Sequence, residues 1–148
     1  MRLGIPESLK QEHRALHKKL QSAIDEGGEV GAAALEVKKL LHPHFLREEE
    51  FALPPLGLLA PLSEGKPAED IKDVLKMTDR LKLELPSMLE EHKQIVAALD
   101  KLSEVANELG KTKHVRFGKK LKLHAKTEEE VLYPAAILVG EYLKAKNK

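Results

Sequence analysis

The sequence predicts an all-α protein, an up-down four-helix bundle with a pseudo-twofold internal repeat and a short C-terminal helix. Three observations lead to this prediction. Apolar residues recur at steps of three and four residues along the 148-residue chain, which is the spacing of amphipathic helices. No stretch alternates apolar and polar residues as a half-buried strand does. Short connections separate four main helical segments, which is typical of an up-down bundle.

Two helices are predicted in the first half of the chain. The first spans residues 6–27, because Pro6 suits the first turn of a helix and glycines at its far end stop it. The second spans residues 29–51. Pro43 lies inside it and is expected to kink it, because proline removes a backbone hydrogen bond.

The second half contains two further main helices and a shorter one. The third helix is predicted over residues 67–110, with Pro86 marking either a kink or a division into two helices. Thr112 is a plausible N-cap for the fourth helix, which leads to the next proline. Residues 135–146 are predicted to form the short fifth helix.

The composition excludes several classes of protein. With 42% apolar and 33% charged residues, the chain is neither disordered nor a membrane protein. The absence of cysteine excludes disulfides, iron–sulfur clusters, thiolate zinc sites and thiol catalysis. A formal net charge of +1 gives no overall attraction to nucleic acid or anionic lipid, so we expect neither partner. The N-terminus has no apolar signal segment, and we therefore expect a cytoplasmic protein.

Six polar residues occupy positions of the helical apolar seams where leucine is expected. They come from all four main helices, and each is predicted to point into the core. A buried carboxylate costs several kcal/mol unless it is paired, so the six need a common explanation. They are His13, His44, Glu48, His92, His124 and Glu128.

An internal repeat relates these residues. His13 and His92 follow a glutamate and are 79 residues apart, while His44 and His124 are 80 residues apart and each begins His-x-x-x-Glu. Histidine and glutamate at positions i and i+4 lie on one face of a helix. Each half of the chain therefore offers two imidazoles and one carboxylate to the middle of the bundle.

Four histidines and two carboxylates suit a pair of transition-metal ions. Imidazole is a good ligand for iron, copper, nickel and zinc, and a carboxylate can bridge two metals. We expect Glu48 and Glu128 to bridge the metals. We expect each half to supply the histidines of one ion, His13 with His44 and His92 with His124.

These motifs resemble the hemerythrin-like, or HHE cation-binding, domains. The resemblance rests on HFLREEE, HAKTEEE and the two lone histidines, and it covers nearly the whole chain, so that residues 1–148 would form a single domain. It implies a four-helix bundle around a non-haem diiron centre, with two iron ions joined by an oxo or hydroxo bridge. An open position would then accept O₂, peroxide or nitric oxide, which implies O₂ binding or sensing.

The chain departs from the oxygen-carrying members of that family. Met88 stands four residues before His92, where those members have a further histidine, and Glu128 replaces an aspartate placed one residue later. One ligand is therefore missing, and His17 is the alternative candidate for it. The alternative functions are a diiron oxidoreductase, either a peroxidase or one that handles nitric oxide, and an iron-sensing or iron-storing module.

The remaining histidines and glutamates have plainer interpretations. His42 and His114 lack repeat partners and are expected at the surface. The glutamates that follow Glu48 and Glu128 turn away from the seam by about 100° or 200°, so most are expected in solvent. They are Glu49, Glu50, Glu129 and Glu130.

Two other segments are unusual. Residues 111–126 carry seven lysines and arginines and no acid, which makes either a solvated face or a site for phosphate or an acidic partner. Residues 56–62 are strongly apolar for a loop. They either cap one end of the bundle, which we expect, or form a homodimer contact. The sequence points to no particular redox partner.

Overall fold

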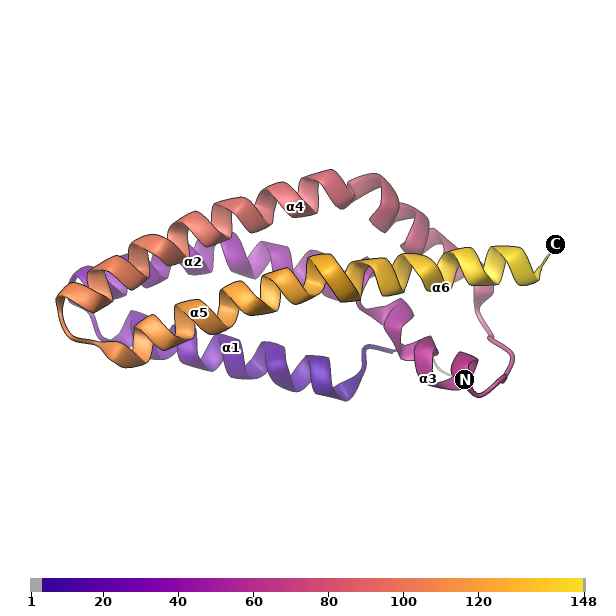
Figure 1. Cartoon of the computed structure of the whole chain (residues 1–148), viewed down its shortest axis with the longest axis horizontal. Coiled ribbons are helices and arrows are strands. Elements are labelled where there is room, and N and C mark those ends of the chain that lie inside the picture. Colours follow the sequence, from indigo (N-terminus) through magenta and orange to yellow (C-terminus); the bar gives the residue numbers. More distant parts are fainter. Residues whose placement is uncertain (1–3, 148) are drawn as a thin grey trace.

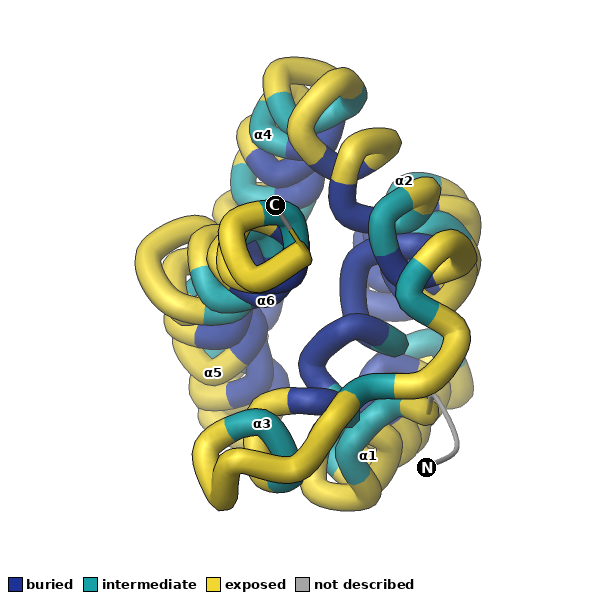
Figure 2. Tube along the Cα trace, turned by 90° about the vertical axis from the view of Figure 1, so that its right-hand side faces the viewer, coloured by how far each residue is buried: buried dark blue, intermediate teal, exposed yellow. Residues whose placement is uncertain are grey.

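The computed structural model describes residues 4–147, and all regular elements in this range are helical. Four long helices run up and down beside one another (Figure 1), and their buried faces meet in the interior (Figure 2). Each packs on the next, and the first packs on the last, so the bundle closes. The predicted bundle is confirmed. Its helices are α1 (Glu7–Asp25), α2 (Gly28–Arg47), α4 (Ile71–Glu108) and α5 (Thr112–Thr127).

A short π-helix follows both α2 and α5. These are η1 (Glu48–Ala52) and η3 (Glu128–Leu132), so each begins at one of the two seam glutamates. In η1 the Leu53 N–H donates to the Glu48 carbonyl over 2.8 Å, and in η3 the Tyr133 N–H donates to the Glu128 carbonyl. The repeat seen in the sequence is therefore also a repeat of backbone geometry, and π-helical turns occur often at functional sites.

The predicted C-terminal helix is confirmed as α6 (Tyr133–Lys146). It continues the line of α5 and η3 as one rod (Figure 1). Proline is tolerated at the start of a helix, and Pro134 lies in the first turn of α6. The rod therefore passes this proline without a break.

Two details of the predicted helix ends are corrected. The helix α4 contains Pro86 without division into two, and it begins at Ile71, four residues later than expected. Thr112 is the first residue of α5 and not its N-cap, because Lys111 occupies that position and no side chain caps the helix.

The apolar segment predicted over residues 56–62 caps one end of the bundle. It forms a 3₁₀-helix, η2 (Pro54–Leu58), and a short helix, α3 (Leu59–Ser63). Leu58 is 1% exposed and packs in one apolar cluster with Val74 of α4 and Val139 of α6. The capping interpretation is therefore confirmed.

Apolar side chains fill the bundle on both sides of the polar seam. One cluster is built from α1, α2, α4 and α5 and includes Leu16 and Leu99. The other lies nearer α6 and includes Phe51, Met88 and Tyr133. The seam residues thus lie in an interior from which water is largely excluded. Within the described residues, no helix combines the length and the apolar character that a membrane crossing needs.

Candidate metal centre

All six seam residues of the sequence analysis meet inside the bundle. None is more than 5% exposed, and the two glutamates are 0% and 1% exposed. One histidine comes from each of the four long helices, and the glutamates begin the two π-helices. The assignment of these residues as metal ligands remains a prediction, and their convergence is the observation on which it rests.

The donor atoms form two groups that share one carboxylate. Atoms of the first group lie within 4.8 Å of one another and come from His44, Glu48, His92 and Glu128. The second group contains His13, His124 and the same Glu128.

This grouping differs from the expected one, because the pairs cross between the two halves of the chain. The Nε2 atoms of His44 and His92 are 2.9 Å apart. Each helix of the closed bundle packs on two others, so the helix order allows both pairings, and in the structure the histidines of α2 and α4 face each other, as do those of α1 and α5. Sequence repeats show which residues are equivalent, but they do not show which neighbours face each other.

The two seam glutamates lie between the groups. One oxygen of Glu128 is 3.0 Å from His92 Nε2 and the other is 3.1 Å from His124 Nε2. One oxygen of Glu48 lies 3.5 Å from His44 Nε2 and 3.9 Å from His13 Nε2. Each carboxylate therefore faces one histidine of each group, as a bridging ligand does.

A second ring of carboxylates contacts the Nδ1 atoms of the four histidines, on the side away from the centre. The Nδ1 atom of His44 lies 2.7 Å from Glu91, and that of His92 lies 3.0 Å from Glu129. The repeat-related residues make the corresponding contacts. Glu12 contacts His124 Nδ1, and Glu49 lies 3.5 Å from His13 Nδ1.

These contacts leave every Nε2 atom directed at the centre, because a carboxylate on Nδ1 fixes both the tautomer and the ring orientation. Glu49 and Glu129 are exposed, as expected, but they also contact the site and are not merely solvated. In the sequence, a glutamate precedes each lone histidine of the repeat, as Glu12 and Glu91, and this pattern could have predicted two members of the outer ring.

Tyr133 is a site residue that the sequence analysis missed. Its hydroxyl donates to Glu48 over 2.8 Å and lies 3.1 Å from His92 Nε2 and 3.3 Å from His44 Nε2. In an α-helix, a residue five positions after Glu128 would lie about 140° away from it. The π-helical turn absorbs one extra residue and returns Tyr133 to the seam, while Val131 is 55% exposed.

The two central carboxylates have opposite pKa shifts. Burial, together with the adjacent Glu128, raises the pKa of Glu48 well above its usual range. Burial alone would also raise the pKa of Glu128, but hydrogen bonds from Glu48 and His124 lower it well below its usual range. Without a metal, the opposite shifts therefore favour the protonated form of Glu48 and the ionised form of Glu128.

Two buried atoms at the centre have no hydrogen-bond partner within the described residues. They are His13 Nε2 and Glu48 Oε1, which are 3.9 Å apart. Buried polar groups are normally satisfied, and an unsatisfied one requires an explanation. A cation between the two atoms would satisfy both, so the donor set fits a metal ion of the kind that imidazole and carboxylate ligands bind.

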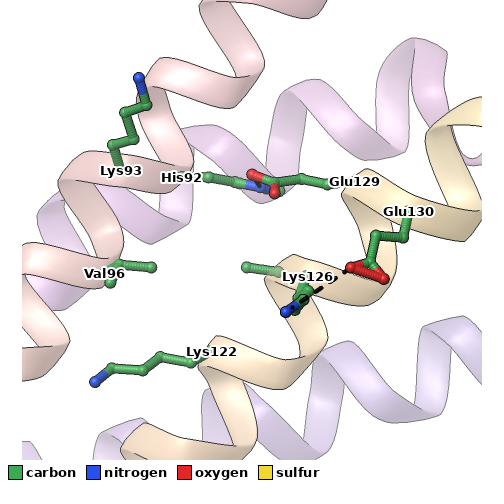
Figure 3. Close-up of a pocket in the computed structure, with 8 residues that line it drawn as sticks. His92, Lys93, Val96, Lys122, Lys126, Glu129 and Glu130 are labelled. Carbon is green, nitrogen blue, oxygen red and sulfur yellow. Dashed lines mark hydrogen bonds and ion pairs between the residues drawn. The ribbon is translucent and has the colours of Figure 1, made fainter.

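A hollow of about 520 Å³ opens between α4 and α5 beside the centre. His92 and Glu129 point toward each other across it, and Val96 lines its wall (Figure 3). Ala125 also lines it. In the repeat, Ala125 corresponds to Phe45, whose ring stacks on His13 with centroids 3.9 Å apart. A bulky side chain thus covers one face of the centre, while a small one leaves the hollow at the other.

The other histidines lie outside the two donor groups. The Phe45 ring packs against both His13 and His17, and His17 belongs to neither donor group. His42 is exposed, as expected. The surface position expected for His114 is wrong, because this residue is 1% exposed and its ring lies 3.2 Å from Glu26.

Comparison with protein families gives one match. The model of the hemerythrin HHE cation-binding domain matches residues 4–136, which include all six seam residues and Tyr133. Searches of curated proteins and of solved structures gave no significant match.

Proposed function

Because the chain belongs to the hemerythrin HHE cation-binding family, we propose that it holds two iron ions at this centre and binds or senses O₂ or a related small ligand. The observation that supports the proposal most is the pair of buried donor groups that share Glu128. Two ions at these positions would neutralise the buried carboxylates and occupy the unsatisfied atoms. The family match supports a cation, the imidazole-rich donor set is compatible with iron, copper, nickel or zinc, and the resemblance to the hemerythrin-like domains favours iron among them.

The residues have distinct roles in this proposal. His44 and His92 would hold one ion and His13 and His124 the other, with Glu128 common to both groups. Glu48 belongs to the first group and lies 3.9 Å from His13 Nε2 of the second, so it would be the further carboxylate between the two ions. A bound iron pair supplies a change of oxidation state next to a small ligand. Tyr133 would orient Glu48 through the hydrogen bond that its hydroxyl donates.

The experiment is metal analysis combined with absorption spectroscopy of aerobically purified protein. We expect two iron ions per chain at full loading and near-ultraviolet bands that disappear on chelation. The matched variants are His124→Ala, which should lose metal, and His42→Ala, which should not. One zinc per chain with no second metal would contradict the proposal.

An oxidoreductase that acts on peroxide or nitric oxide is the second candidate function. The observation that favours it is Met88, which is fully buried in the apolar cluster at the place where oxygen carriers have a histidine. With one ligand fewer, a bound small ligand is less protected from water. Mixing the reduced protein with O₂ in a stopped-flow instrument distinguishes the two candidates. Rapid oxidation supports the oxidoreductase, and a spectrum that reverses when O₂ is removed supports a carrier.

A further inference from the structure

A second hollow lies between α1 and α5 and shares no residue with the candidate metal centre. Its volume is about 540 Å³, which is within the range of small-molecule sites. Buried Phe117 and His114 belong to its lining, and no carboxylate does. Five cationic side chains from the two helices surround it. They are Lys18, Lys19, Lys113, Arg116 and Lys120.

These five cations differ from Lys111 and Lys126, which lie near the two ends of α5. Over residues 4–147, none of the five forms an ion pair with a carboxylate. By contrast, Lys111 lies 3.6 Å from Glu26, and Lys126 lies 3.9 Å from Glu130. Positive charge therefore accumulates at this hollow, although the chain as a whole is nearly neutral.

Two of the cations approach each other. The side chains of Lys19 on α1 and Lys120 on α5 both line the hollow, and the proximity of Lys120 lowers the pKa of Lys19. Two ammonium groups have only donors to offer, so neither can accept the other's hydrogen bond. An acceptor that carries negative charge and lies between them would satisfy both.

We infer that this hollow binds an organic phosphate, a small molecule in which a phosphate or polyphosphate group is joined to an apolar or planar group. Phosphate oxygens accept charge-assisted hydrogen bonds from lysine and arginine. Phe117 and His114, which are 3% and 1% exposed, line the bottom of the hollow, and the apolar part would rest against them. Extended nucleic acid is not favoured, because a single-strand site needs a series of aromatic side chains and the chain is only 3% aromatic.

The test measures binding of ATP and of inorganic pyrophosphate by calorimetry, with the metal-loaded protein as purified. The variant is Lys19→Gln with Lys120→Gln, and the matched control is Lys72→Gln with Lys76→Gln, two exposed lysines of α4. We expect ATP to bind more tightly than pyrophosphate. The first pair of substitutions should weaken binding about tenfold or more, because hydrogen bonds to charged groups are lost, and the control pair should not.

The variant also reports on folding. Removal of the two facing charges relieves repulsion, so the unliganded variant should melt no lower than the wild type. ATP should raise the melting temperature of the wild type and of the control variant only.

Three outcomes would overturn the inference. The first is the absence of binding to either compound. The second is binding that both double variants retain, which would place the phosphate at the metal centre. The third is binding only to vesicles of phosphatidylcholine and phosphatidylglycerol, which would make the surface a membrane contact.

Discussion

Tyr133 donates a hydrogen bond of 2.8 Å to Glu48, a residue from the other half of the chain. In the repeat, Tyr133 corresponds to Leu53, so the tyrosine has no equivalent on the opposite side. The hydroxyl lies beside His44 and His92 but not beside the other two histidines. The two halves of the centre are therefore chemically different, although their backbones are alike.

The first prediction is that Tyr133→Phe destabilises the metal-free protein. The substitution leaves a buried oxygen of Glu48 without its partner, which costs about 1–3 kcal/mol. Chemical denaturation in the presence of a chelator measures the free energy of unfolding. The loss should be smaller in the metal-loaded protein, because a bound ion would contact the same carboxylate.

Tyr142→Phe is the matched control, since these are the two tyrosines of the chain. The Tyr142 side chain is 42% exposed, and its hydroxyl only accepts a 3.4 Å hydrogen bond from Lys146. We expect it to change the free energy of unfolding by less than about 0.5 kcal/mol. Equal losses for the two substitutions would show that the Tyr133 hydroxyl does not support Glu48.

The second prediction concerns the outer carboxylates. Glu129→Ala removes the acceptor that holds His92 Nδ1 at 3.0 Å, and loss of such a partner typically lowers metal affinity by about 10–100-fold. Competition with a coloured chelator measures the affinity. Glu130→Ala is the control, because Glu130 is exposed and pairs with Lys126 at 3.9 Å. An equal effect of both substitutions would indicate general electrostatics and not orientation of the ring.

The helical architecture and the six central residues were predictable because both follow the three- and four-residue spacing of an α-helix. Helical seams repeat every three or four residues, and a polar residue in a seam is conspicuous there. The repeat then identified His13 with His92 and Glu48 with Glu128. Burial of all six residues bears out this part of the reasoning, whatever they bind.

What the sequence did not reveal depends on departures from the α-helical period and on which helices are neighbours. Tyr133 reaches the centre only through the π-helical turn that begins at Glu128, and no residue type marks that turn in advance. The pairing of His44 with His92 depends on which of its two neighbouring helices each histidine faces at the centre, and the repeat does not encode this choice. His114 lacked a repeat partner, but its burial follows from a contact with Glu26, a residue 88 positions away.

The third prediction is that His17→Leu leaves metal binding unchanged. The aromatic ring of Phe45 stacks on His13 and packs edge-on to His17, and His17 shares no donor group with the seam residues. We therefore expect the same metal content and spectrum as in the wild type, whereas His13→Leu should lose metal. Loss of metal from the His17 variant would instead make His17 the missing ligand and would support reversible O₂ carriage.

The fourth prediction is a dependence of stability on pH in the metal-free protein. Burial and Glu128 raise the pKa of Glu48 in the folded state above its unfolded value. The contribution of Glu48 to stability is then fully present below the unfolded pKa, and it is lost as the pH rises through the folded pKa. Glu48→Gln carries a neutral side chain at every pH. The stability of the wild type should therefore fall relative to this variant as the pH rises, in denaturation curves measured with a chelator.

The raised pKa of Glu48 also leads to a prediction of how metal binding depends on pH. A ligand carboxylate must lose its proton, so metal loading should release a proton at every pH at which Glu48 is still protonated. Calorimetric titrations in buffers with different ionisation enthalpies measure the number of protons released, and the apparent metal affinity should fall as the pH falls. Although burial lowers the pKa of His92, its contacts with Glu128 and Glu129 raise it overall, so more protons should be released at lower pH. Heats that are the same in every buffer would show that Glu48 is already ionised, or that it does not contact the metal.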